Sequence, residues 1–121
     1  QDHIHPKKHF TQRRLDALGI DSAEKREAFI ERFNRLPNLQ LLQATPNMEK
    51  SGTMFEEWLS VTIKDPIQLK QYKELHLIPA EQSLAFKDFI EFFDARESLI
   101  RSRLHHILNV KQTTDKEESV P

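Results

Sequence analysis

Three short polar segments of this 121-residue chain combine side chains that could hydrolyse a phosphodiester bond. They are Asp2-His3-Ile4-His5-Pro6, Asn38-Leu39-Gln40-Leu41-Leu42 and Asn47-Met48-Glu49-Lys50. Such hydrolysis needs a base that activates water, and a neutral imidazole has the ordinary pKa best suited to that task near neutral pH. It also needs a hard cation on the phosphate, and carboxylate and amide oxygens are suitable ligands for Mg²⁺. The segments therefore contain a candidate base, candidate metal ligands and, in a lysine, a candidate phosphate contact.

The spacing of these segments resembles that of the HNH endonucleases, which belong to the ββα-metal or His-Me finger superfamily. In that family the middle Asn precedes the last metal ligand by nine residues, and a Lys follows that ligand by three. Asn38, Asn47 and Lys50 match both intervals. Asn47 stands where the family often has His, a variant that also occurs in the HNH domain of RNA-guided DNA nucleases.

More narrowly, the chain resembles the C-terminal nuclease domain of GmrSD-like type IV restriction enzymes over about residues 2–109. The run Phe89-Ile90-Glu91-Phe92-Phe93 and Arg96, on a long closing helix, also fit that subgroup. The resemblance implies a divalent-metal-dependent DNA endonuclease that is part of a restriction or phage-defence enzyme. Its expected partners are DNA, in which bases could be modified, and an upstream nucleotide-hydrolysing ParB-like domain of the same protein.

Carried over residue by residue, the resemblance implies that His3 is the general base that deprotonates the attacking water. Asp2 and Asn47 would hold a single Mg²⁺ or Mn²⁺ ion, which acts as a Lewis acid and stabilises the departing oxygen. Asn38 would either position the imidazole or brace the hairpin that carries it. Lys50 would support a single-turn helix or contact phosphate.

Other residues near the first segment leave alternatives open. His5 either supports a residue of the site from behind, contacts phosphate, or is a histidine of a solvated loop, and motif statistics favour the last. Asn34 competes with Asn38 for the middle role, but the nine-residue interval favours Asn38. A basic cluster close to the proposed base would either contact the DNA backbone or form a solvated face; its members are Lys7, Lys8, Arg13 and Arg14.

Composition excludes several other classes of protein. The chain has no Cys, so it has no disulfide framework, no Cys nucleophile and none of the structural zinc that many HNH domains hold on cysteine pairs. Its 18 basic and 19 acidic residues leave a net charge of −1, so any contact with DNA must be a local patch. No apolar run approaches the roughly 20 residues of a membrane span. We therefore expect no membrane partner and a cytoplasmic location.

Helix signals dominate the rest of the chain, and two glycines are too few for Rossmann, P-loop or multi-hairpin folds. Capping residues, prolines and apolar periodicity predict five helices and one strand. The first two helices are expected from Thr11 to Gly19 and from the Asp21-Ser22-Ala23-Glu24 capping box to Pro37. The other three are expected after the Thr53-Met54-Phe55-Glu56 capping box, over 66–75 after the Asp65-Pro66 pair, and over 85–109. The strand is expected over 38–43. A helical turn is expected to begin at Pro46.

The longest helix carries apolar residues at helical spacing, which we interpret as core. They are Phe86, Phe89, Ile90, Phe93, Ile100, Leu104, Ile107 and Leu108. Residues 111–121 are polar and aperiodic, so we expect a disordered tail there.

The predicted fold class is α+β, mostly α: a ββα-metal core packed with additional helices, including the long C-terminal one. Residues 1–110 would form the nuclease domain. Because the motif begins at residue 2, the first strand of the core is truncated, and we expect the chain to be a fragment of a longer protein. The alternative function is a non-catalytic helical module that docks onto another domain or binds DNA without cutting it. An RNA-directed nuclease stays open, although no aromatic platform favours RNA.

Overall fold

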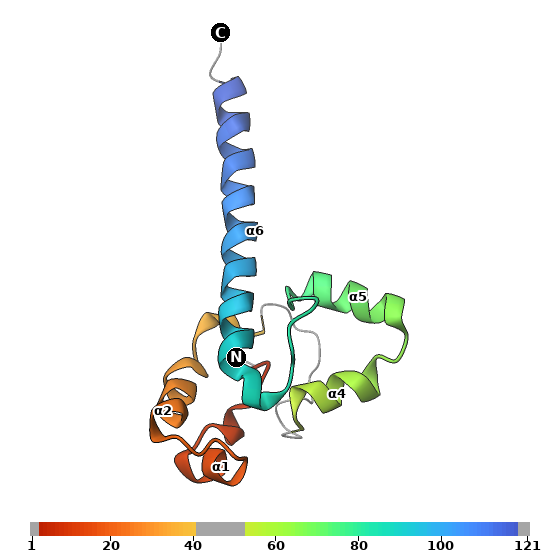
Figure 1. The fold of residues 1–121 in the computed structure, drawn as a ribbon. Coiled ribbons are helices and arrows are strands. Elements are labelled where there is room, and N and C mark those ends of the chain that lie inside the picture. The colour runs from red at the N-terminus through yellow and green to blue at the C-terminus, as the bar shows by residue number, and fades with distance from the viewer. Residues whose placement is uncertain (1–2, 41–52, 119–121) are drawn as a thin grey trace.

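The structure, a computed structural model, describes the backbone of residues 3–40 and 53–118 and the side chains of these residues up to 109. The α-helices in these ranges are α1 (Gln12–Ala17), α2 (Ala23–Arg32), α4 (Phe55–Thr62), α5 (Pro66–Leu75) and α6 (Phe89–Glu118). Three 3-10 turns accompany them: η1 (Lys7–His9), η2 (Leu36–Asn38) and η3 (Phe86–Asp88). Helices α1 and α2 lie on one side of the first turns of α6, and α4 and α5 lie on the other side (Figure 1).

The described part of the chain is mostly helical, as the sequence predicts. Its β structure is limited to one isolated antiparallel bridge, between His3 and Leu39. Asn38 ends η2 rather than opening a strand, and residues 41–43 of the expected strand lie outside the described ranges. The turn expected from Pro46 also lies outside them. The ββα core therefore stays a prediction, and the β structure of the described residues is this single bridge.

Two helix boundaries follow directly from local capping chemistry. The Thr11 hydroxyl accepts a hydrogen bond from the Arg14 backbone N–H at 3.1 Å, and α1 ends before Gly19, whose φ is +90°. Asp65 accepts from the Gln68 N–H at 3.2 Å, and Pro66 occupies the first turn of α5. A side-chain acceptor at the N-cap satisfies one of the N–H groups that a helix start leaves unpaired. The predicted starts of both helices are confirmed.

Two other helix starts differ from the predicted capping boxes. The N-cap of α2 is Ser22, whose hydroxyl accepts from the Lys25 N–H at 3.3 Å, so the cap lies one residue beyond Asp21. The N-cap of α4 is Met54, whose side chain makes no capping bond. Asp and Ser cap almost equally well, so local preference does not decide between neighbours. For α4 the deciding term is packing, since its first residue, Phe55, is buried.

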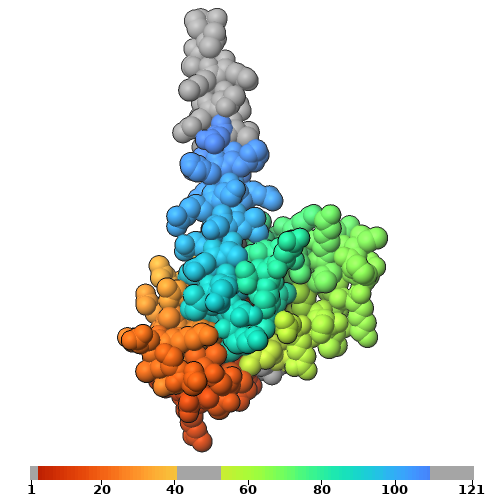
Figure 2. All heavy atoms as spheres, viewed as in Figure 1, coloured from red at the N-terminus to blue at the C-terminus, as the bar shows by residue number. Residues whose placement is uncertain are grey.

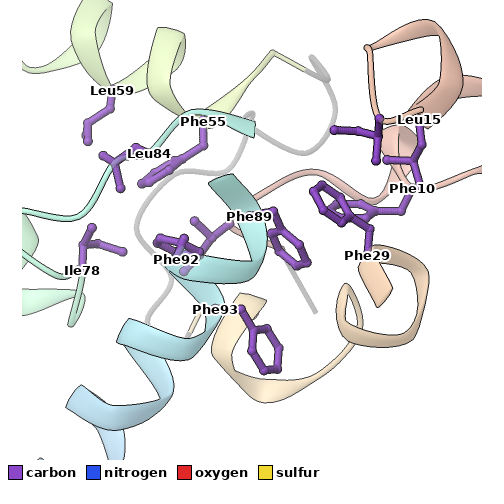
Figure 3. Packing of buried hydrophobic residues seen from close by; sticks show 12 residues of the cluster. Phe10, Leu15, Phe29, Phe55, Leu59, Ile78, Leu84, Phe89, Phe92 and Phe93 are labelled. Carbon is purple, nitrogen blue, oxygen red and sulfur yellow. The ribbon is translucent and has the colours of Figure 1, made fainter. Parts of the chain in front are cut away.

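A phenylalanine-rich core surrounds the first turns of α6 (Figure 3). The ring centroid of Phe89 lies 4.8 Å from that of Phe10 and 5.2 Å from that of Phe29, and all three side chains are buried. On the other side, Phe92 lies 6.4 Å from Phe55 of α4. Aromatic side chains bury large apolar areas and prefer such edge or tilted contacts. The start of α6 therefore joins the α1–α2 side of the molecule to the α4 side.

Arg96 connects this core to the turn η2. Its side chain is buried, and its guanidinium donates to the backbone oxygens of Pro37 at 3.0 Å and Leu39 at 2.8 Å. It also donates to the oxygens of His76 and Leu77, both at 3.1 Å. Burial lowers the pKa of Arg96 to about 10, so the group stays charged at neutral pH. One side chain thus fixes η2 against the end of α5.

The apolar stripe of α6 is core only over its first turns. Phe89 and Phe93 are buried, but Leu104, Ile107 and Leu108 are 55%, 54% and 49% exposed. The prediction that the whole stripe is core is wrong, because the distal part of the helix stands clear of the body of the molecule (Figure 2). Helical periodicity reports an apolar face, but only tertiary packing determines whether another element covers it.

The same helix extends further than the sequence analysis expects. Its backbone is helical through Glu118, whereas we expected an end near residue 109 and a disordered tail over 111–121. The expected helix end near residue 109 is corrected, whereas the disordered tail over 111–121 stays a prediction. Residues 111–118 contain neither Gly nor Pro, and no proline lies between Pro79 and Pro121, so nothing in this segment breaks a helix once it has started. Within the described ranges, no helix is both long enough and apolar enough to cross a bilayer.

Candidate functional site

The first two polar segments are paired in space although more than thirty residues separate them. The Ile4 backbone N–H donates to the Asn38 backbone oxygen at 2.7 Å, next to the bridge between His3 and Leu39. The Asn38 side chain is fully buried beneath this pairing. Its Oδ1 accepts from the His5 N–H at 2.9 Å, and its Nδ2 donates to the oxygens of His5 at 3.1 Å and Phe33 at 2.8 Å.

Asn38 thereby satisfies three backbone groups at once with one amide. A carboxamide carries both an acceptor and two donors, so Asn can bond to the N–H and the C=O of the same extended residue, which no carboxylate can do. Of the two roles expected for Asn38, the geometry is that of bracing the segment that carries the imidazole. The bonds of its side chain go to backbone groups of His5 and Phe33, and the role of a catalytic residue stays a prediction.

Asn34, rather than Asn38, contacts the proposed base. The Nε2 atom of His3 lies 2.9 Å from Asn34 Oδ1, and the imidazole stacks on Phe33 with ring centroids 5.8 Å apart. The side chain of His3 is 5% exposed. The sequence analysis placed Asn34 below Asn38 because it relied on an interval along the chain. The sequence signal for Asn34 is its position two residues after the end of α2. A polar side chain there can face the segment that packs against that end of the helix.

The base borders a pocket at the molecular surface. A pocket of about 470 Å³ is lined by His3, Lys7, Phe33, Asn34 and Leu39. This site, the His3 pocket, combines an imidazole, an amide and an ammonium group on a small apolar wall. The volume is sufficient for a phosphate group with an attached sugar.

Cationic side chains lie near the His3 pocket. Lys7 and Lys8 are both exposed on η1, but only Lys7 lines the pocket. Arg13 and Arg14 are exposed on α1, and Arg14 Nε donates to Nδ1 of the buried His9 at 3.3 Å. The sequence left open whether this cluster is a DNA contact or a solvated face. Its exposure is compatible with both, and Lys7 is the member that borders the pocket of the proposed base.

His5 does not belong to the pocket. Its ring is fully buried, with the rings of Phe55, Phe86, Phe89 and Phe92 at centroid distances between 4.8 and 6.0 Å. Neither ring nitrogen has a hydrogen-bond partner among the described residues. Burial, together with the nearby His9, lowers the pKa of His5 to about 3. Two of the expectations, a phosphate contact and a solvated loop histidine, are wrong for this residue, because the aromatic core excludes solvent from it.

The proposed metal ligands Asp2 and Asn47, and the proposed phosphate contact Lys50, lie outside the described residues. Within the described ranges, no group of three or more His, Cys, Asp or Glu side chains lies close enough together to hold a metal ion. Among the described residues of the pocket, Asn34 has an amide oxygen, the kind of hard ligand that suits Mg²⁺ or Mn²⁺, and such a group alone does not make a metal site. The pocket fits a one-metal site only if Asp2 and Asn47 complete the ligand set.

The contact between Asn34 and His3 joins an amide oxygen to a ring nitrogen, and its polarity depends on the tautomer of the imidazole. When Asn34 Oδ1 accepts, Nε2 carries the proton and donates, so the lone pair resides on Nδ1. In that tautomer Nδ1 is the basic nitrogen of the ring, which is what a general base requires. Comparison of the chain with models of known protein families and with curated proteins gives no match.

Proposed function

We propose that this chain is an HNH-type, divalent-metal-dependent DNA endonuclease domain built on a ββα-metal core. One observation carries the proposal. The segment that starts at His3 pairs with the segment that contains Asn38 and Leu39, and the imidazole of His3, bonded to Asn34, borders a polar pocket. A chance resemblance in sequence gives no reason for two distant motifs to lie side by side. A nuclease core requires it, because the base and the hairpin that braces it must form one unit.

In the proposed reaction, His3 accepts a proton from the water that attacks the phosphorus atom. Asn34 acts as a positioning residue that holds Nε2 of the imidazole. Phe33 limits rotation of the ring by stacking on it. General-base catalysis of this kind contributes roughly 10²–10⁴-fold to the rate, and it depends on the orientation of the base.

A single Mg²⁺ or Mn²⁺ ion, held by Asp2 and Asn47, would supply Lewis-acid stabilisation of the negative charge on the phosphate and the leaving oxygen. The remaining positive charge would come from side chains of the chain itself. Lys7 lines the His3 pocket and would contact a phosphate oxygen, with Lys50 on the opposite motif. Lys8 would contact the DNA backbone outside the pocket.

The proposal is tested by plasmid nicking in Mg²⁺ or Mn²⁺ with the parent chain, His3→Ala and His106→Ala. His106 is exposed on α6 far along the chain from the motif, so it is the matched control for the loss of one imidazole. We expect His3→Ala to lower the nicking rate by at least about 100-fold and His106→Ala to leave it unchanged. Equal rates for His3→Ala and the parent would show that the assigned base is wrong.

A second candidate function is a non-catalytic docking module, and the distal half of α6 favours it. Leu104, Ile107 and Leu108 form an exposed apolar row, and such rows on soluble proteins mark contact surfaces. This candidate predicts no nicking by the parent chain with either metal. It also predicts that the parent chain self-associates in sedimentation velocity and that a Leu104→Gln/Ile107→Gln variant does not. The nuclease proposal requires neither result.

A further inference from the structure

A second pocket lies between α5 and α6, on the part of the molecule that the proposed nuclease chemistry does not use. It has a volume of about 380 Å³, within the range of small-molecule sites, and it shares no lining residue with the His3 pocket. Its lining residues come from α5, from the turn that follows α5, and from α6. We call it the α5–α6 pocket.

The chemistry of this pocket is divided between floor and rim. The floor is apolar, and its main members are Leu69, Leu77, Ile78 and Leu99. Four charged side chains surround it: Lys70, Lys73, Arg103 and Glu74. Three cations and one acid leave the rim with two positive charges in excess, in a chain whose net charge is −1.

One floor residue occupies a backbone conformation that its side chain disfavours. Leu77 has a φ of +56°, and no other residue except Gly19 has a positive φ in the described ranges. It follows the C-cap of α5, where the Ile78 N–H bonds to the Lys73 oxygen at 2.8 Å and the Leu77 N–H to the Glu74 oxygen at 3.4 Å. This is the Schellman arrangement, in which glycine is the usual residue because it meets no steric penalty.

The fold itself does not require leucine at this position. The Leu77 backbone oxygen accepts from Arg96 Nε at 3.1 Å, a bond that glycine would make equally well. The side chain instead lies at the floor of the α5–α6 pocket, where glycine would leave a gap. Strained residues cluster at functional sites, where the strain is retained for what the side chain does.

We propose that the α5–α6 pocket binds a small organic anion with an apolar body, of the size of a medium-chain carboxylate or alkyl phosphate. The apolar floor would bury the body of the ligand, and the excess positive charge of the rim would complement its acidic group. A neutral molecule of the same shape would gain binding energy from the apolar floor alone. A cationic one would in addition be repelled by the positive rim. The proposal does not depend on the nuclease function, since the two pockets share no residue.

The test is titration of the chain with octanoate and octyl phosphate, followed by the backbone amide NMR signals of Leu77, Ile78 and Leu99. We expect saturable shifts with a dissociation constant on the order of 1 mM for one or both anions. The two anions distinguish a carboxylate from a phosphate ligand. Octanol and octylammonium, which have the same chain, are the neutral and cationic controls and should bind more weakly. Octanol binding as tightly as either anion, or no saturation by either, would overturn the proposal.

Variants assign the binding to floor and rim separately. Lys70→Glu reverses an exposed rim charge and should weaken octanoate binding about two- to fivefold or more, while Lys25→Gln on α2 is the control for a lost surface lysine. Leu77→Gly should weaken binding while leaving thermal unfolding unchanged or raising its midpoint, because it relieves the backbone strain. A Leu77→Gly variant that binds as tightly as the parent would show that the side chain is not retained for a ligand. Since Lys70 is exposed, its variant stays informative if the Leu77 variant does not fold.

Discussion

Replacing the buried His5 by leucine should make the protein more resistant to acid. The substitution is close to isosteric, it keeps an apolar side chain among the four phenylalanine rings, and it removes two ring nitrogens that have no partner among the described residues. The Asn38 bonds to residue 5 involve only its backbone, so they persist in the variant. Removing an unsatisfied buried polar group is worth about 1–3 kcal/mol at neutral pH.

The pH dependence follows from the difference between the folded and unfolded states. The pKa of His5 is about 3 in the folded protein and 6.5 in the unfolded chain. Between these values the unfolded state binds a proton that the folded state excludes, so the free energy of unfolding falls as the pH drops below 6.5 and is fully restored above it. Linkage gives a loss of about 2 kcal/mol at pH 5 relative to pH 7, and this value barely changes as long as the folded-state pKa stays below about 4.

The assay is urea unfolding of the parent, His5→Leu and His106→Gln at pH 7 and pH 5, monitored by the fluorescence of Trp58. The stability difference between His5→Leu and the parent should grow by about 2 kcal/mol at the lower pH. His106→Gln removes an exposed histidine and controls for the number of imidazoles. If the stability difference between His5→Leu and the parent were the same at both pH values, His5 would be protonated at pH 5 in the folded state as readily as in the unfolded chain. That result would refute the enclosure of His5 by the aromatic rings.

Three further predictions concern the residues that hold the site together. Asn38→Leu should lower the free energy of unfolding by about 2–4 kcal/mol, because three backbone groups lose their partner, and an unchanged urea midpoint would contradict the bracing role. Arg96→Met should cost about 3–5 kcal/mol in the same assay because it leaves the oxygens of η2 and of the end of α5 unpaired; a loss below about 1 kcal/mol would mean that water replaces the guanidinium. Asn34→Ala should lower the nicking rate about 10- to 100-fold with little change in DNA affinity or stability, and an equal loss of affinity would argue against a positioning role.

The core connects the stability predictions to the site. His5 is packed in the aromatic cluster while His3, two residues earlier, lies at the pocket, so one extended segment both anchors itself and presents the base. Asn38 fixes the backbone between these two positions. The geometry of the His3 pocket therefore depends on the packing around the start of α6, and we expect core variants near Phe92 to affect nicking as well as stability.

Local chemistry made several elements predictable from the sequence. Thr11, Gly19 and the Asp65-Pro66 pair determine helix ends through bonds within one turn, so they act in nearly any tertiary setting. The proximity of the two motifs was expected from the resemblance to the HNH family, and the structure brings His3 and Asn38 into one region. The roles of Asp2 and Asn47 stay predictions.

The sequence alone determined the helical character of the chain, the caps that begin α1 and α5, and the two polar segments that belong together. Only the tertiary structure decided that His5 is enclosed by phenylalanines, that Asn34 rather than Asn38 holds the imidazole, and that the apolar row at the distal end of α6 remains exposed. The physical reason is the range of the interactions. Capping bonds and turn conformations are completed within a few residues, whereas burial and side-chain pairing depend on which distant segments fold against each other.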